Sequence, residues 1–372
     1  MSTMDIIKLL ASIVSAFAVG LYSIPIVIKI AVKKDLVAKP NHRTSHTGRI
    51  PNVGGVSIFV AFVLSFLFSA NIEVFPSFQY FLFALIALFF VGLYDDIMII
   101  SAKKKLLGEI VGILGMVILG DIRLSNLHGF FGIEQIPYMV SILLTLFVIV
   151  VIINALNLID GIDGLASGIG MVIALFFGIY FILAGGDKNF QLAILSFCLF
   201  SSLIPFFLFN VFANRNKIFM GDAGALILGF IIAVLVVEFC ETNISAGAYR
   251  INNAPVMALC VLVIPLFDTI RVFTIRLSQR KSPFTPDKNH LHHILLNTGL
   301  NHRKSTAVLA SVNIAYILFG LACQDMQPYL FFMLVFVSCV IWTEALRYRA
   351  NKIKDSLMSK KTVTAEIYNI EN

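Results

Sequence analysis

The chain has 372 residues, of which 59% are hydrophobic and only 13% are charged, and its mean hydropathy is +0.91. This composition excludes an ordinary soluble protein, because apolar runs of this length and density are typical of transmembrane helices. The runs are continuous rather than alternating, which argues against a transmembrane β-barrel. The formal net charge is +7, but the positions of the charges along the chain say more about the protein than their sum.

Eleven apolar segments approach the ~20 residues that a helix needs to cross the hydrocarbon core. In chain order they cover 6–32, 54–70, 78–94, 106–120, 138–156, 165–184, 190–209, 223–240, 254–273, 305–322 and 329–346. The first is too long for a cleaved signal peptide. Five cysteines are scattered along these runs without metal or disulfide spacing. We therefore expect an all-α, multi-pass membrane protein with about 11 transmembrane helices.

The connections between the segments form two alternating sets that differ sharply in charge. One set, made of 33–53, 95–105, 157–164, 210–222, 274–304 and the tail after 346, holds 22 lysines and arginines; the other holds 3. The positive-inside rule places the first set in the cytoplasm, with the N-terminus outside and the C-terminus inside. Residues 1–346 are expected to form one transmembrane domain. Residues 347–372 are expected to form a basic, partly helical cytoplasmic tail.

The first two inner connections carry polar motifs. The first contains "KPNHRTSHTGRIPNVGG", with Arg43 and His46. The second, "DDIMIISAKKKLLGE", starts with Asp95 and Asp96 at the end of an apolar segment. Two carboxylates there oppose the helix dipole, so we expect a positive group to offset them, either the run Lys103–Lys105 or a metal ion. Alternatively, the acidic pair only ends a helix at water and the lysines only signal topology.

The third inner connection, "NALNLIDGIDGLASG", places Asn157, Asp160 and Asp163 three residues apart. On a helical turn this spacing puts the three side chains on one face. Gly161 and Gly164 allow a close approach of backbone or ligand. The alternative is that the two aspartates are helix N-caps.

The last two inner motifs are "MGDAGALILGF" and "SPFTPDKNHLHH". In the first, glycines flank Asp222 and would expose backbone N–H groups beside a carboxylate, unless the motif is only a capped helix start. The second gathers acidic, basic and imidazole side chains, which suggests a loop that reads phosphate or sugar, although ordinary loop histidines are the alternative. Its residues are Asp287, Lys288, His290, His292 and His293.

All five motifs lie on the expected cytoplasmic side. Carboxylates and an asparagine at one membrane face favour Mg²⁺ or Mn²⁺, which usually accompany substrate phosphates. The sequence therefore predicts metal-assisted phosphoryl transfer at the inner surface, with one substrate drawn from the lipid bilayer and no nucleic-acid partner. An ion-coupled transporter is the main alternative, but it would favour inverted repeats and midplane charges. A non-catalytic scaffold is the other.

The motifs, in this order, resemble the signatures of the polyprenyl-phosphate N-acetylhexosamine-1-phosphate transferases over residues 33–300, and most closely the WecA-like branch. The related phospho-MurNAc-pentapeptide transferases have a different final loop. The resemblance implies that Asn157 and Asp222 hold Mg²⁺ and that Lys105 contacts the donor diphosphate. It implies catalytic roles for Asp95, Asp96, Asp160 and Asp163, and substrate contacts from the first loop (Arg43, His46) and the last (Asp287, Lys288, His290, His292, His293).

The implied reaction gives undecaprenyl-diphosphate-sugar and UMP from undecaprenyl phosphate and a UDP-N-acetylhexosamine, and it would initiate a cell-envelope glycan at the bacterial inner membrane. UDP-GlcNAc is the favoured donor; another UDP-N-acetylhexosamine and UDP-MurNAc-pentapeptide are the alternatives. Direct attack by the lipid phosphate is favoured over a covalent Asp160 intermediate. Lys288 and Ala225 stand where the family usually has Arg and often has Ser. The oligomeric state is open, a homodimer included.

Overall fold

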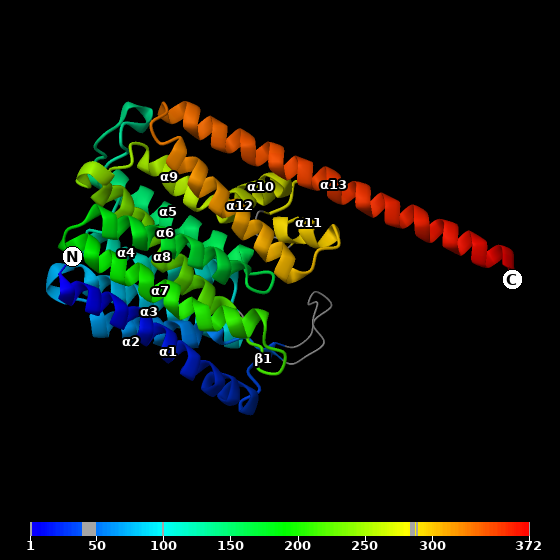
Figure 1. Ribbon diagram of the computed structural model, residues 1–372, viewed down its shortest axis with the longest axis horizontal. Coiled ribbons are helices and arrows are strands. Elements are labelled where there is room, and N and C mark those ends of the chain that lie inside the picture. The colour runs from blue at the N-terminus through cyan, green and yellow to red at the C-terminus, as the bar shows by residue number, and fades with distance from the viewer. Residues whose placement is uncertain (1, 39–49, 99, 283–286, 288, 372) are drawn as a thin grey trace.

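The computed structural model describes residues 2–38, 50–98, 100–282, 287 and 289–371. Helices form nearly all of the described chain (Figure 1). They are α1 (Thr3–Lys33), α2 (Gly54–Ser69), α3 (Phe78–Met98), α4 (Ala102–Leu119), α5 (Tyr138–Ile159), α6 (Leu165–Ala184), α7 (Asp187–Val211), α8 (Gly221–Asn243), α9 (Ala254–Val261), α10 (Val263–Ser278), α11 (Leu291–Asn297), α12 (His302–Ala322) and α13 (Pro328–Glu371), with short 3₁₀ turns at Ile72–Val74, Phe130–Gly132 and Gly247–Tyr249.

A two-residue strand pair is the one departure from the expected all-α class within the described residues. β1 (Val37–Ala38) runs antiparallel to β2 (Ile50–Pro51). The carbonyl of Pro51 then accepts a hydrogen bond from the N–H of Phe219 at 2.9 Å. The end of the first inner connection is thereby fixed beside the start of α8.

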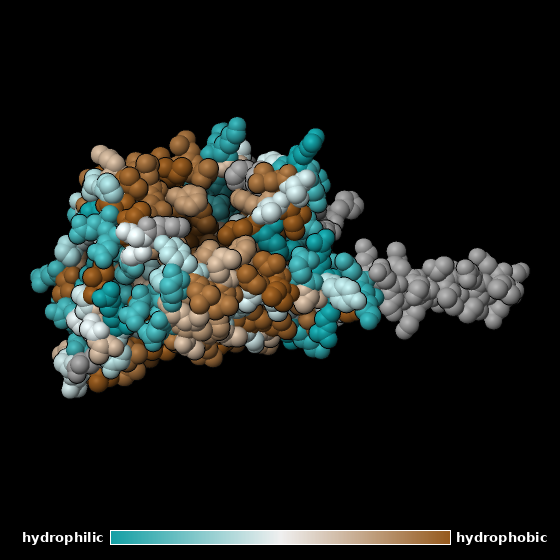
Figure 2. Space-filling model, turned by 90° about the horizontal axis from the view of Figure 1, so that it is seen from above, coloured by the Kyte–Doolittle hydropathy of each residue, from teal (hydrophilic) through white to brown (hydrophobic). Residues whose placement is uncertain are grey.

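Ten of the eleven predicted segments each lie within one helix, to within a residue at the end, and 254–273 is divided between α9 and α10. The helices differ in their capacity to span a membrane. Eight described helices are long and apolar enough; α9 and α10, bent by 81°, make a ninth if they count as one broken span, and α2 has only 16 residues. Figure 2 shows a hydrophobic band across one face, with hydrophilic residues toward both ends. The protein is therefore a polytopic helical membrane protein, and the count of eleven and the orientation stay predictions.

Helix α8 lies at the centre of the bundle, and the apolar stretch that is long enough to cross a membrane is completely buried. It packs against α2, α3, α5, α6 and α7. Small residues permit this crowding: a Cβ placed on Gly55 of α2 would lie 2.1 Å from the backbone nitrogen of Gly224 in α8. The start of α2 and the end of α3 consequently meet at the N-terminus of α8, where the acidic motifs lie.

Helix α13 continues from the last apolar segment into the basic tail without a break, and its distal part projects away from the bundle (Figure 1). The membrane-compatible part is Pro328–Ile353. The expected helical character of the tail is thus present, and the domain boundary at residue 346 stays a prediction.

Candidate active site

A cluster of charged side chains lies where the ends of α3, α4, α5 and α8 meet. Lys105 Nζ on α4 lies 3.0 Å from Asp95 Oδ2 on α3 and also pairs with Asp222 Oδ1 on α8. Asn157 on α5 donates from Nδ2 to the same Asp222 oxygen at 2.8 Å. Four residues from three separate sequence motifs therefore meet at one point, and Lys105 provides the positive charge that the acidic pair was expected to need.

Asp96 has a different role from its neighbour Asp95. Its two carboxylate oxygens accept the backbone N–H groups of Asp222 and Ala223 at 2.8 and 3.0 Å, and Asn52 donates to it at 3.0 Å. A carboxylate at the N-terminus of α8 is favoured by the helix dipole. Gly221, with φ +72°, gives this approach its space, since a Cβ there would lie 2.7 Å from Asp96 Oδ2. Two N–H groups that the sequence predicted to be exposed beside Asp222 are thus bound by Asp96.

The expectation that Asn157, Asp160 and Asp163 share one helical face is wrong. Helix α5 ends at Ile159, Asp160 is its C-cap, and Asp163 lies in the turn before α6. Neither aspartate is the N-cap of α6, because Gly164 takes that position with φ +77°. The helix ends between Asn157 and Asp160, so the two aspartates do not continue the helical face of Asn157.

Asp160 is the least satisfied carboxylate of the cluster. Within the described residues its side chain has no hydrogen-bond partner, whereas both oxygens of Asp95 and both oxygens of Asp96 are bound. Burial, together with the negative charges of Asp222, Asp96 and Asp163, raises the pKa of Asp160 well above its usual value of 3.8. A cation at this place would lower that pKa again.

Asp163 holds the turn after α5 in place. Its Oδ2 lies 2.6 Å from Lys217 Nζ and 3.2 Å from His302 Nδ1, and its carbonyl accepts the Thr306 hydroxyl at 2.8 Å. Burial opposes ionisation, but the hydrogen bonds from His302 and Lys217 outweigh it and lower the pKa of Asp163. The turn is therefore tied both to the connection before α8 and to α12.

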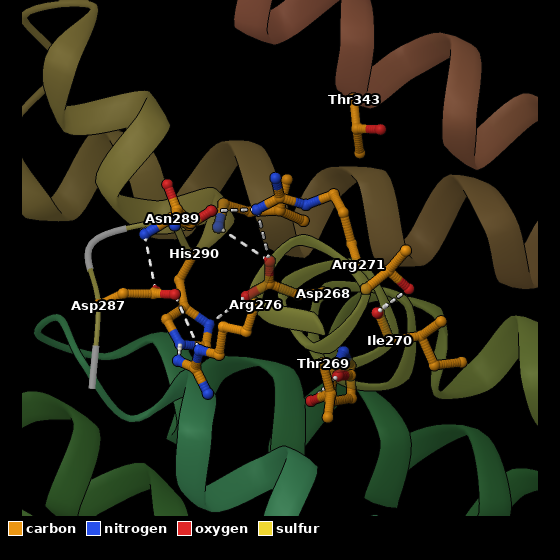
Figure 3. Close-up of polar contacts among 12 residues, drawn as sticks. Asp268, Thr269, Ile270, Arg271, Arg276, Asp287, Asn289, His290 and Thr343 are labelled. Carbon is orange, nitrogen blue, oxygen red and sulfur yellow. Dashed lines mark hydrogen bonds and ion pairs between the residues drawn. The ribbon is translucent and has the colours of Figure 1, made fainter. Parts of the chain in front are cut away.

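The histidine loop (residues 287 and 289–293) is fastened to α10 by ion pairs (Figure 3). Buried Asp268 accepts from His290 Nδ1 at 2.9 Å, from the Leu291 N–H at 3.0 Å and from Arg271 Nη2 at 3.1 Å. Asp287 pairs with Arg276 at 2.8 Å. Although burial opposes it, this hydrogen bond with Arg276 helps to lower the pKa of Asp287 to about 2.

His292 connects the histidine loop to the turn after α5. Its ring packs on Gly161, where a Cβ would lie 2.4 Å from His292 Nε2. The ring is also stacked parallel to His290, and its centroid lies 4.3 Å from that of His293. Burial and the neighbouring His293 lower the pKa of His292 to about 3, so its imidazole is neutral at pH 7. A contact between residues about 130 positions apart thus joins the two motifs.

Gly161→Ala is expected to lower activity about tenfold, because the new methyl group must displace a buried imidazole and overpacking typically costs ~1–3 kcal/mol. Gly168→Ala is the matched control, since its Cβ would meet no atom closer than 3.6 Å. Steady-state rates of both purified variants provide the measurement. Equal activity of the two would show that the contact between His292 and Gly161 has no role in turnover.

Arg43, His46 and Lys288 lie outside the described residues. Sequence reasoning missed several residues that support the site: Asn52, which holds Asp96, and Asp268, Arg271 and Arg276, which hold the histidine loop. An available signal was the charge pattern of "DTIRVFTIR", where an acid and two bases interrupt the end of an apolar segment. Buried Glu109, which accepts from Asn154 at 2.7 Å, was visible in the same way.

The donor atoms suit a hard divalent cation. No group of three His, Cys, Asp or Glu side chains among the described residues could enclose a metal ion. Asp95 and Asp222 nevertheless direct oxygens at one ammonium group, and the Asn157 amide lies beside them. Mg²⁺ is typically bound by one or two carboxylates together with substrate phosphates, so these residues fit a site completed by the substrate.

Residues 78–240 match the model for glycosyl transferase family 4. Three relatives named undecaprenyl-phosphate alpha-N-acetylglucosaminyl 1-phosphate transferase align over most of both chains. The protein of Yersinia pestis is 33% identical over 82% of each chain, that of Salmonella typhi 32% over 84%, and that of Pasteurella multocida 34% over 81%.

The chain belongs to glycosyl transferase family 4. It is a phosphoglycosyltransferase of the polyprenyl-phosphate N-acetylhexosamine-1-phosphate transferase group and a multi-pass membrane protein with bacterial relatives. The resemblance inferred from the motifs is confirmed, and membership in an enzyme family removes the transporter and scaffold alternatives.

Proposed function

We propose that this transferase moves GlcNAc-1-phosphate from UDP-GlcNAc to undecaprenyl phosphate at the cytoplasmic face of the bacterial inner membrane. An oxygen of the lipid phosphate forms a bond to the sugar-linked phosphorus of the donor. The bond from that phosphorus to the bridging oxygen breaks, and UMP leaves. The main support is the meeting of Lys105, Asn157 and Asp222, the packing of His292 on the turn after α5, and the names of the relatives.

Asp222 and Asn157 are the proposed holders of Mg²⁺ (or Mn²⁺), which would supply charge neutralisation at the diphosphate. Lys105 is held by Asp95 and Asp222, and its ammonium group would stabilise negative charge on the UMP leaving group. Asp95 has one oxygen bound to Lys105 and the other to the Ile100 N–H at 2.8 Å. Asp95 therefore serves to position Lys105, and Asp96 serves to position the start of α8.

Direct attack by the lipid phosphate remains our favoured route. Burial and the neighbouring carboxylates raise the pKa of Asp160, which disfavours the ionised form that a nucleophilic attack requires. The lipid phosphate is already largely ionised at pH 7, so it needs little help from a base. Asp160 would then face the reacting phosphates electrostatically, while Asp163 would position the turn that carries it.

The histidine loop is proposed to bind the nucleotide sugar. Neutral His292, the neighbouring His290 and His293, and Asp287 offer donors and acceptors for sugar and phosphate oxygens. Arg43, His46 and Lys288 are proposed as further substrate contacts. A lysine at 288 keeps the charge of the family's usual arginine but lacks its bidentate fork, so it bears on donor choice.

The proposed function is tested by incubating the purified protein with undecaprenyl phosphate, Mg²⁺ and a series of UDP-N-acetylhexosamines. We expect UMP release to be fastest with UDP-GlcNAc. A preference for another donor would overturn the donor assignment but not the reaction class. The same assay with donor labelled in the sugar-linked phosphate and no lipid acceptor should leave no label on the protein. Stable labelling of the chain that Asp160→Asn abolishes would overturn direct attack.

A further inference from the structure

A polar pocket lies behind the histidine loop, on the side formed by α10, α11 and α13. Its volume is about 180 Å³, far more than a single water molecule requires. Six polar side chains line it: Arg271, Gln279, Asn289, Asn297, Arg347 and Asn351.

The lining is rich in hydrogen-bond donors and contains no carboxylate. Arg271 pairs with Asp268, but its buried Nε has no hydrogen-bond partner among the described residues. Among the described residues, Arg347 pairs only with the exposed Glu344, at 3.7 Å. Two guanidinium groups and four amide side chains make a site for an anion with several oxygens, and phosphate is the anion that arginine recognises best in this way.

The position of the pocket indicates where such a phosphate comes from. Arg347 and Asn351 lie near the end of the membrane-compatible part of α13, Pro328–Ile353, and basic residues follow on the same helix. Arginines at this level of a membrane protein extend to the headgroup region, and basic residues there attract anionic lipids.

We propose that this pocket binds a phosphate group, supplied by an anionic phospholipid headgroup or by free phosphate, and that the bound group holds the histidine loop in its donor-binding form. Arg271 provides the connection, because it lines the pocket, pairs with Asp268 and donates to the carbonyl of Asn289 in the loop. The effect on the loop rests on the proposed function, whereas phosphate binding itself does not.

The test compares Arg347→Gln with Arg349→Gln. Both remove one exposed positive charge from the same helix, but only Arg347 lines the pocket. Thermal unfolding of the full chain is followed in nanodiscs of phosphatidylcholine, with and without phosphatidylglycerol, and in detergent with inorganic phosphate or chloride at equal ionic strength. We expect phosphatidylglycerol to raise the Tm of the wild type and of Arg349→Gln by on the order of 2–4 °C, and Arg347→Gln to lose this gain.

A gain from phosphatidylglycerol alone identifies a lipid headgroup as the source; a gain from inorganic phosphate as well identifies the phosphate group itself as sufficient. Equal losses in both variants, or no gain in the wild type, would overturn the proposed site. The link to the loop is read separately, as a severalfold rise in KM for the nucleotide sugar in Arg347→Gln with kcat unchanged. Normal KM with lost stabilisation would overturn only the link, and an inactive wild type with intact stabilisation would overturn only the proposed function.

Discussion

Asp222→Ala is expected to reduce turnover by about 10³-fold while leaving membrane insertion intact. Asp222 Oδ1 is the atom at which Lys105 and Asn157 meet, and the side chain is a proposed metal ligand. The substitution leaves the ammonium group without its second carboxylate and removes the only charged metal ligand that we assign. The measurement is the initial rate of UMP release across an Mg²⁺ titration, made on protein recovered from the membrane fraction.

Asp187→Asn is a suitable control for Asp222→Ala. Asp187 is an exposed carboxylate in the first turn of α7, so its loss changes the net charge without touching the cluster. The control should retain normal turnover and normal Mg²⁺ dependence. Near-normal turnover of Asp222→Ala would mean that the metal assignment is wrong. An equal loss of turnover in both variants would show that the change in net charge causes the loss.

The positions of the helices were predictable because their signal is local. A run of about twenty apolar residues has few soluble alternatives; ten of the eleven runs form one helix each, and the run 254–273 forms two. Charge counts likewise placed the polar motifs together on one expected face. The meeting of Lys105 with Asp95 was also within reach, since two adjacent carboxylates at a helix end need a counter-charge and a lysine run follows them.

The partners of each carboxylate depend on contacts distant in sequence, and these could not be predicted. A three-residue spacing fits both a helical turn and a helix end. The turn after α5 is held by a contact distant in sequence, because Asn210 accepts the N–H of Gly164 at 2.6 Å. The division between Asp95, which binds a lysine, and Asp96, which binds the start of α8, follows from the close crossing of α2 and α3 over α8. The local sequence around Asp95 and Asp96 gives no sign that the two adjacent aspartates have different partners.

Asp268→Ala is expected to raise KM for the nucleotide sugar about 10²-fold. Asp268 is 1% exposed and joins His290, Leu291 and Arg271. Removing one partner of a buried ion pair typically costs ~3–5 kcal/mol, because the remaining charge is left uncompensated. The histidine loop can relieve that cost by leaving α10, so much of the loss should appear as a smaller population of the donor-binding form. Steady-state kinetics with varied donor and saturating lipid acceptor measure the effect.

Asp268→Asn is the graded companion to this variant. Its amide oxygen can still accept the Leu291 N–H, but the negative charge facing Arg271 and His290 is gone, so KM should rise by an intermediate factor. The elution profile in gel filtration shows whether each variant is still folded. If folded Asp268→Ala lost kcat with an unchanged KM, the loop would act on the chemical step rather than on donor binding. The histidines would then belong with Lys105 and Asp222 among the groups that stabilise the transferring phosphate.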